Sequence, residues 1–431
     1  MIRVWSGMNG KDGELMTTID IPGVHTEQGL KTEDLVVNIG PQHPSTHGVL
    51  RLVTTLNGEV VKDMEPVIGY LHRSKEKMAE SRSYFQYQPT LDRVEYLSSF
   101  FDHYVYVASI EKIANLKVPK RVQYIRMITM EMNRITSHLL WFGTFLLDLG
   151  ATSPLFYAFR EREDIFKLFE DVTGARMMYN YYRFGGVNAD LPPGWIEKCR
   201  QFIRTVPQKI DEYEAIVTKN PIVLDRTVGI GRMDYETCMR YGVTGPSLRA
   251  TGIAQDLRKT NPYCCYDEID FEVPVGKHAD VYDRYLVRMA EMRESCKIIE
   301  QCLDRIPGGD TQNIRNKQAE IEEARKIAKE KGEDPKAIPD IDPDWQYQGQ
   351  KINLMTYKPP AGEAFMTCES PRGMLGCYMV SDGTPKAYRV KWRGASFSNL
   401  SVLPELMIGN LYPDLMAIFG SLDVILPEVD R

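Results

Sequence analysis

The chain has 431 residues, 43% hydrophobic and 26% charged, so it is long enough to bury a large core and has an ordinary globular composition. Its net charge of −6 argues against a nucleic-acid-binding surface, which would carry a basic excess. The longest apolar stretch runs from Leu139 to Leu147, well short of the roughly 18–20 residues that span a bilayer. We therefore expect any membrane association to come through a partner protein.

The N-terminal part of the chain favours strands. Residues 1–34 mix glycine, acidic and scattered apolar residues, which predicts an extended arm. Residues 35–70 contain short runs rich in β-branched side chains, and Asn57-Gly58 between two such runs is a strong hairpin signal. The sequence therefore predicts an N-terminal β domain.

The middle of the chain favours helices. Apolar residues recur at three- and four-residue spacing, which predicts helices at residues 93–115, 121–149, 157–174, 194–217 and 281–306. We assign residues 71–309 to this helical core. Residues 310–346 form a charged, proline-containing insertion, in which residues 317–331 indicate either a solvated surface helix or disorder.

Residues 347–431 form a C-terminal α+β segment. Strand-like sequence returns after residue 362, and two short helices are expected near residues 403–408 and 414–421. The chain is therefore predicted to be an α+β protein, with a large helical core between N-terminal and C-terminal β layers.

The eight cysteines predict a reducing environment. None of them forms a C-x-x-C pair, and no signal peptide is recognisable, so a location on the cytosolic side is expected. The adjacent Cys264 and Cys265 are too isolated to hold an iron–sulfur cluster, and we expect no metal bound by this chain.

The most distinctive loop is Gly40-Pro41-Gln42-His43-Pro44-Ser45-Thr46-His47-Gly48. Two prolines and two flanking glycines disfavour a helix or a central strand. Because histidine titrates near neutral pH, a rigid loop with two of them indicates a proton-handling site. A simple turn with two incidental histidines has equal weight on this evidence.

Two further polar residues are candidates for chemistry. Asp148 ends a very apolar helix, so its carboxylate must reach water or find a cationic partner. Tyr96 is expected in the first turns of the helix at residues 93–115, where packing is its more common role. The P-loop, zinc-protease and serine-hydrolase motifs do not occur in the sequence.

The stretch Asn38–Leu52 closely resembles one family. That family is the 49-kDa subunit, lettered D, of the proton-pumping NADH:quinone oxidoreductases (complex I, NDH-1, and their photosynthetic relatives). Further matches extend to the last residue, at Ile68–Arg73, Tyr157–Glu163, Gly185–Val187, Asp256–Lys259, Glu291–Ser295, Val380–Gly383 and Glu428–Arg431.

The resemblance implies a fold similar to the large subunit of nickel–iron hydrogenases. Those enzymes end in D-P-C-x-x-C-x-x-H, and alignment on Asp423 places Ile425 and Glu428 where the cysteines would stand. Because soft metals need such thiolates, the resemblance implies the scaffold without the metal.

The resemblance also implies the site residues. In the family, a tyrosine and a histidine that match Tyr96 and His47 are proposed to hydrogen-bond the two carbonyls of a quinone, and the residue matching Asp148 is the acidic partner of the histidine. A quinone that gains two electrons needs two nearby proton donors, which Tyr and His can supply. Arg73 and Arg93 match arginines that approach a 4Fe-4S cluster held by a neighbouring subunit.

As a family member, the chain would be an oxidoreductase and proton-pumping translocase subunit, active only within its complex. The implied partners are the cluster-bearing subunit (lettered B), a second neighbouring subunit (lettered C) and the membrane-arm subunit (lettered H), and no nucleic acid. The implied location is peripheral, on the cytoplasmic side of the cell membrane or of a thylakoid-type membrane. A non-redox assembly scaffold derived from a hydrogenase-like protein is the rival interpretation, but it gives no reason to keep His47, Tyr96 and Asp148 together.

One position departs from many relatives. They carry a histidine next to the cluster where this chain has Met178. Since methionine cannot titrate, we expect the midpoint potential of the neighbouring cluster to be nearly flat between about pH 6 and 8, and a slope approaching one proton per electron would contradict this. Met178 favours the photosynthetic branch, which leaves NADH and ferredoxin as alternative electron donors.

Overall fold

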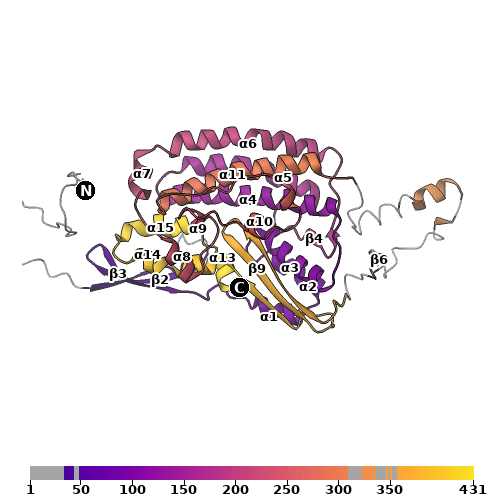
Figure 1. The fold of residues 1–431 in the computed structure, drawn as a ribbon, viewed down its shortest axis with the longest axis horizontal. Coiled ribbons are helices and arrows are strands. Elements are labelled where there is room, and N and C mark those ends of the chain that lie inside the picture. Colours follow the sequence, from indigo (N-terminus) through magenta and orange to yellow (C-terminus); the bar gives the residue numbers. More distant parts are fainter. Residues whose placement is uncertain are drawn as a thin grey trace, which may run out of the picture.

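A layer of long helices lies over two small sheets (Figure 1). The computed structural model describes residues 34–42, 48–308, 324–332 and 357–431, together with short pieces at 322, 334–335, 346–347 and 350–351. The helical layer consists of α3 (Ser99–Ile113), α4 (Lys120–Asp148), α5 (Ser153–Thr173), α6 (Trp195–Val217) and α11 (Val281–Arg305).

The long helices confirm the predicted helical core. Helix α4 packs against both α5 and α11, so it is buried on nearly all sides, which explains its weak polar face. Helix α5 ends at Gly174, whose positive φ closes the last turn, and α11 begins after Asp280, whose carboxylate accepts from the Asp283 amide.

The prediction for Tyr96 is wrong in one respect. Helix α3 begins at Ser99, and Tyr96 lies in the turn between α2 (Tyr84–Leu91) and α3. The reason is tertiary. The amide of Glu95 donates to Asp102 Oδ2 at 2.9 Å, and Asn133 Nδ2 donates to the carbonyl of Leu97 at 2.9 Å. Side chains thus satisfy the backbone of this turn, and it need not be helical.

The N-terminal sheet is antiparallel in the order β1 (Asp34–Ile39), β2 (Arg51–Asn57) and β3 (Val60–Val67). The β2–β3 hairpin turns at the predicted Asn57-Gly58. The C-terminal sheet contains β8 (Gly362–Ser370), β9 (Gly373–Ser381) and β10 (Arg389–Arg393), also antiparallel. The α+β fold class is therefore confirmed.

Shorter elements connect these layers. They are α1 (Lys75–Ser81), β4 (Tyr182–Arg183), β5 (Gly186–Val187), α7 (Pro221–Thr227), α8 (Tyr235–Tyr241), α9 (Pro246–Arg249), α10 (Leu257–Thr260), η2 (Tyr266–Glu268), β6 (Gln346–Tyr347), β7 (Gln350–Lys351), α13 (Ala395–Ser401), α14 (Leu403–Met407), η4 (Tyr412–Asp414), α15 (Leu415–Leu422) and α16 (Leu426–Asp430). Helices α14 and α15 confirm the two predicted near the C-terminus.

Two predicted segments fall mainly outside the described residues. The N-terminal arm is described only from residue 34. In the charged insertion, residues 324–330 are helical, and most of the remaining positions lie outside the described residues. Within the described part of the chain, no helix is long and apolar enough to cross a membrane.

Buried charges tie the helical layer to the C-terminal sheet. We call this group the central ionic network, and its members are Glu131, Arg134, Arg249, Asp256, Arg258, Glu291 and Glu369. Arg249 contacts Glu291 at 2.6 Å and Glu369 at 2.7 Å. Glu131 accepts from Arg134, Arg258, Ser295 and Tyr266. Although burial alone would raise it, these arginines and hydroxyls lower the pKa of Glu131 to about 2.

Candidate functional site

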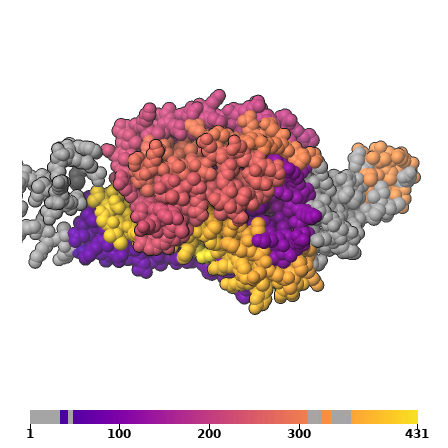
Figure 2. All heavy atoms as spheres, in the orientation of Figure 1, coloured from indigo at the N-terminus to yellow at the C-terminus, as the bar shows by residue number. Residues whose placement is uncertain are grey.

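The C-terminal segment 423–430 joins the regions that carry the candidate residues. It lies beneath the helical layer and next to the N-terminal sheet (Figures 1 and 2). The carboxylate of Asp430 accepts from the amides of Gly69 at 2.8 Å and Leu71 at 2.7 Å, which fixes the segment leading to Arg73. Residues far apart in sequence therefore meet at this segment.

The distinctive loop between β1 and β2 is anchored on both sides. Gln42 and Val49 form a bridge, and the amide of Leu50 donates to the carbonyl of Pro41 at 3.0 Å. A Cβ on Gly48 would lie 3.0 Å from Leu71 Cδ1 and 3.2 Å from Leu426 Cβ, so the loop packs closely on the C-terminal segment. His47 itself, with His43, lies outside the described residues, and its role stays a prediction.

Tyr96 is half-buried in the turn before α3. The charged groups that act on it among the described residues are Glu95, Arg372 and Asp423. Burial, reinforced by the negative Glu95, raises the pKa of Tyr96. Arg372 bridges the two carboxyls, 3.1 Å from Glu95 Oε2 and 3.3 Å from Asp423 Oδ1. The tyrosine therefore sits beside a buried ionic group.

This group extends behind Tyr96 to three more residues. Asp102 is fully buried on α3, and Lys75 on α1 and Glu428 on α16 are each only 1% exposed. We call Glu95, Asp102, Arg372, Asp423, Glu428 and Lys75 the Glu95 cluster.

The amines and amides of the chain hold two members of the cluster in place. Lys75 Nζ donates to the backbone carbonyls of Arg93 and Pro427. The carboxylate of Glu428 accepts from the amides of Ala395 at 2.8 Å and Ser396 at 3.1 Å. Lys75 thereby links the turn that carries Arg93 to the C-terminal helix α16.

Burial shifts the titration of the Glu95 cluster. It raises the pKa of Glu95 to about 7, although Arg372 opposes the shift. It also raises the pKa of Asp102 well above the ordinary range, and the carboxylates of Glu95 and Glu428 reinforce this. Burial lowers the pKa of Lys75 to about 8. These groups can therefore exchange protons near neutral pH.

Arg73 and Arg93 lie on one hollow. The hollow has a volume of about 300 Å³ and is lined by Arg73, Lys75, Met78, Arg82, Pro89, Thr90 and Arg93. Arg93 is exposed, and its guanidinium donates to the carbonyl of Pro89. The sequence-predicted arginines are thus brought together, with Lys75 and Arg82 as further cations, into a strongly positive surface.

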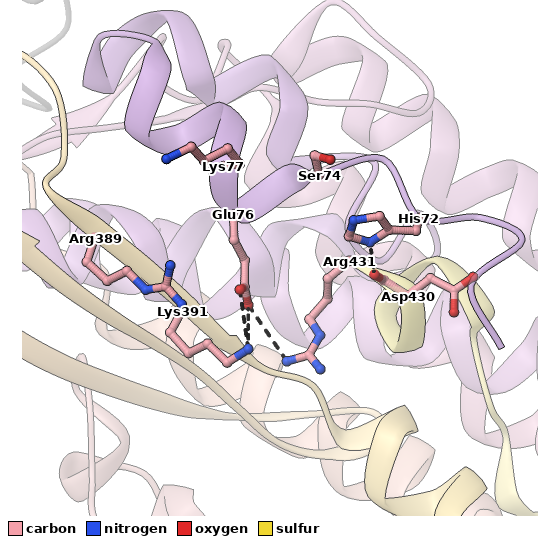
Figure 3. Close-up of a pocket in the computed structure, with 8 residues that line it drawn as sticks. All are labelled: His72, Ser74, Glu76, Lys77, Arg389, Lys391, Asp430 and Arg431. Atoms are coloured by element: carbon pink, nitrogen blue, oxygen red, sulfur yellow. Dashed lines mark hydrogen bonds and ion pairs between the residues drawn. The ribbon is translucent and has the colours of Figure 1, made fainter.

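A second hollow lies on the other side of the C-terminus (Figure 3). His72 Nδ1 is 2.7 Å from the carbonyl oxygen of Asp430. Glu76 pairs with Lys391 at 3.2 Å and with Arg431 at 3.8 Å. The hollow, about 260 Å³, therefore has its charges largely paired within the chain.

Asp148 is placed by a different part of the frame. It is the last residue of α4 and is half-buried. Trp141, two turns earlier, donates from Nε1 to the carbonyl of Gly420 at 2.7 Å, so this end of α4 is held against α15. Asp148 is outside the set of charged groups that act on Tyr96.

Sequence reasoning missed the Glu95 cluster. Its signal was weak: Glu95 stands between the apolar Val94 and Tyr96, and Glu428 lies in the apolar ending of the chain. Acidic residues among apolar ones are usually buried only with partners. The partners come from other parts of the chain, so the pattern alone could not assemble the group.

Comparison with known proteins identifies the family. Residues 148–431 match the model of the respiratory-chain NADH dehydrogenase 49-kDa subunit. The chain belongs to this 49-kDa subunit family. Among the described residues, no group of three or more His, Cys, Asp or Glu side chains could hold a metal ion.

Curated relatives cover nearly the whole chain. They are 49-kDa subunits of NAD(P)H-quinone oxidoreductase, which carry the letter H in their own names and the letter D in complex I. The first of two forms from Gloeobacter violaceus is 47% identical over 93% of this chain and 98% of its own length. The corresponding proteins of Synechococcus sp. (47% identity, 94% and 100%) and of Marchantia polymorpha chloroplasts (46%, 93% and 99%) are similar.

Proposed function

We propose that this chain is the quinone-site subunit of a membrane-associated, proton-translocating quinone oxidoreductase. The carrying observation is its 46–47% identity, over more than nine tenths of its length, with proteins named as subunits of NAD(P)H-quinone oxidoreductase. The quinone would bind near Tyr96, His47 and Asp148, in a cavity completed by a partner subunit.

The residues would divide the proton chemistry between them. Conversion of a quinone to a quinol takes two electrons and two protons. Tyr96 would donate one proton and His47 the other, while Asp148 would orient the histidine and favour its charged form. Rearrangement of the His47–Asp148 pair after proton loss would begin the coupling to proton translocation.

Arg73 and Arg93 would face an iron–sulfur cluster held by the cluster-bearing partner subunit. The hollow that they share with Lys75 and Arg82 fits such a group, because its cations would stabilise an electron-rich cluster. In its own subunit, the cluster supplies electrons one at a time. The arginines of this chain bind none of its iron; they set the local electrostatic potential.

The partners and location follow from this assignment. The cluster-bearing subunit, its peripheral neighbour lettered C and the membrane-arm subunit would surround the chain, which would sit peripherally on the cytoplasmic side of a cell or thylakoid-type membrane. The relatives from cyanobacteria and chloroplasts support the thylakoid-type alternative. Their names specify NAD(P)H, whereas Met178 favoured a branch that uses ferredoxin, so both donors are tested.

The test is quinone reduction by the complex, purified through a tag on a partner subunit and supplied with NADH or reduced ferredoxin separately. Turnover with either donor is expected, and the productive one identifies the electron source. Tyr96→Phe should slow turnover about 100-fold or more, as loss of a positioned acid does. Absence of turnover with both donors would instead favour the assembly-scaffold alternative.

Coupling is tested separately with Asp148→Asn in sealed membrane vesicles. If Asp148 takes part in coupling, proton uptake per quinone reduced should fall while some quinone reduction persists. Unimpaired pumping with full quinone reduction would remove Asp148 from the mechanism.

A further inference from the structure

The Glu95 cluster stands immediately behind Tyr96. Glu95 is its neighbour in sequence, is 3% exposed, and shares Arg372 with Asp423. Tyr96 must recover a proton after each donation, and its half-buried position restricts direct access to water. The structure therefore poses the question of which group returns the proton.

Charge in the cluster is unbalanced around Glu95. Among the described residues, Arg372 is the one cation within ion-pair distance of either Glu95 or Asp423. One guanidinium cannot neutralise two buried carboxylates, so retention of a proton by one of them is favourable. Asp102 adds a third carboxyl, whose Oδ1 has no hydrogen-bond partner in the described part of the chain.

Other charged groups face the cluster from every element packed around it. Lys75 on α1 acts on Asp102, and Glu428 on α16 acts on both Glu95 and Asp102. Arg288 on α11 faces Asp423, and Arg393 at the end of β10 faces Glu428. These two arginines balance the distant carboxyls and leave Glu95 to its shared contact with Arg372.

We propose that Glu95 is the proton-supplying residue that restores Tyr96 after each quinone reduction. This inference rests on the proposed function. When the O–H bond of Tyr96 breaks and its proton forms a new O–H bond on the reduced quinone, a tyrosinate remains. The Glu95 carboxylic acid then gives its proton to that oxygen, which leaves a carboxylate beside Arg372.

The proton is replaced from solvent through Asp102 and Lys75. Asp102 Oδ2 accepts from the backbone amide of Glu95, so the two carboxyl residues are directly connected. Lys75 acts on Asp102 and also lines the hollow that holds Arg73 and Arg93. The sequence of groups thus runs from that hollow to the hydroxyl of Tyr96, and the two electrons come from the partner's cluster.

The experiment compares Glu95→Gln, Glu95→Asp and Tyr96→Phe in the purified complex. Turnover per assembled complex is measured from pH 6 to 9 with the donor that supports activity. Because burial raises the pKa of Glu95 to about 7, the wild-type rate should fall as pH rises through neutrality. Glu95→Gln should be slower at pH 6, on the order of tenfold, and should lack this transition.

Glu95→Asp keeps a titratable carboxyl and should recover a substantial part of the rate, with its transition at a displaced pH. A matched control is Glu161→Gln, because Glu161 is also buried and accepts from a tyrosine, Tyr213, on another part of the helical layer. The control should keep the wild-type rate and transition.

The outcomes separate this inference from the proposed function. If Tyr96→Phe is slow but Glu95→Gln keeps the wild-type rate and profile, Glu95 does not supply the proton. If Glu95→Gln and Glu95→Asp are both slow with a wild-type-shaped profile, the residue is merely structural. If Tyr96→Phe itself is as fast as wild type, both this inference and the assignment of Tyr96 fall.

Discussion

Two groups of buried charges behave in opposite ways in this protein. In the central ionic network, Arg249 alone contacts two carboxylates, and Arg258 contacts Glu131 and Asp256 at 3.1 and 2.7 Å. In the Glu95 cluster, Arg372 is shared between two carboxyls and Asp102 has no arginine at ion-pair distance among the described residues. Both groups are equally buried, so the supply of cations and donors distinguishes them.

The difference shows in the titration of the carboxyls. Burial opposes ionisation in both groups, but three arginines lower the pKa values of Glu131, Asp256 and Glu291. The fourth carboxyl of the network, Glu369, has a raised pKa, as Glu95 does. A buried carboxyl with its own cations is therefore a permanent ionic strut, whereas one without them holds a proton that it can release.

The largest expected effect comes from removing a cation of the central ionic network. Arg249→Met would leave Glu291 and Glu369 buried without their shared partner, which should lower the free energy of unfolding by about 3–5 kcal/mol. Chemical denaturation of the full chain measures this. A loss below about 1 kcal/mol would show that the network is not the strut described above.

The pH dependence of stability should distinguish Glu95 from the central network. Its pKa rises from an ordinary 4.5 to about 7 in the folded chain, so the folded state binds more protons than the unfolded state between these values. Stability should therefore fall as pH rises from about 4.5 to about 7, by about 3 kcal/mol at about 1.4 kcal/mol per pH unit.

Denaturation of wild type and Glu95→Gln across pH 4.5 to 8 tests this difference. The variant should lack the decline contributed by Glu95, so the stability difference between the two proteins should change with pH. A constant difference across the range would mean that Glu95 does not titrate there.

A smaller effect is expected from a neutral donor of the central network. The hydroxyl of Tyr266 donates to Glu131 Oε1 at 2.6 Å, and Tyr266→Phe removes this bond without changing any charge. A hydrogen bond to a buried carboxylate contributes about 2 kcal/mol, and its loss should also weaken the stabilisation of ionised Glu131. An unchanged unfolding midpoint in denaturant would count against a donor-stabilised network.

The smallest effect should come from an exposed ion pair. Lys198 and Asp171 are 2.9 Å apart, but their side chains are 63% and 39% exposed. Lys198→Ala should change the free energy of unfolding by no more than about 0.5 kcal/mol, because solvent screens such pairs. A change as large as that of Arg249→Met would show that burial is not what separates the two classes of ion pair.

The sequence predicted the long helices well because their apolar spacing is set by local geometry. It failed at Tyr96, where Asp102 and Asn133 satisfy the backbone of a turn from outside and α3 starts later than the periodicity indicated. It also could not assemble the Glu95 cluster, since Arg372 and Asp423 reach Glu95 only through the tertiary fold.

The candidate site was predicted unevenly. The motif resemblance named Arg73 and Arg93, which the fold brings to one hollow, and Tyr96, which it places beside the Glu95 cluster. It did not name Glu95 or Lys75, because residues that act through a neighbour have no motif of their own. The role of His47 stays a prediction from the resemblance.

The most direct test of the account is an infrared titration of the full chain, comparing wild type with Glu95→Gln. The carbonyl stretch of a protonated, buried carboxylic acid is distinct from that of a carboxylate, so the difference between the two proteins isolates Glu95. We expect a protonated-carboxyl band that disappears near pH 7 in wild type and is missing from the variant. Identical titrations would show that Glu95 is already ionised and would contradict the account.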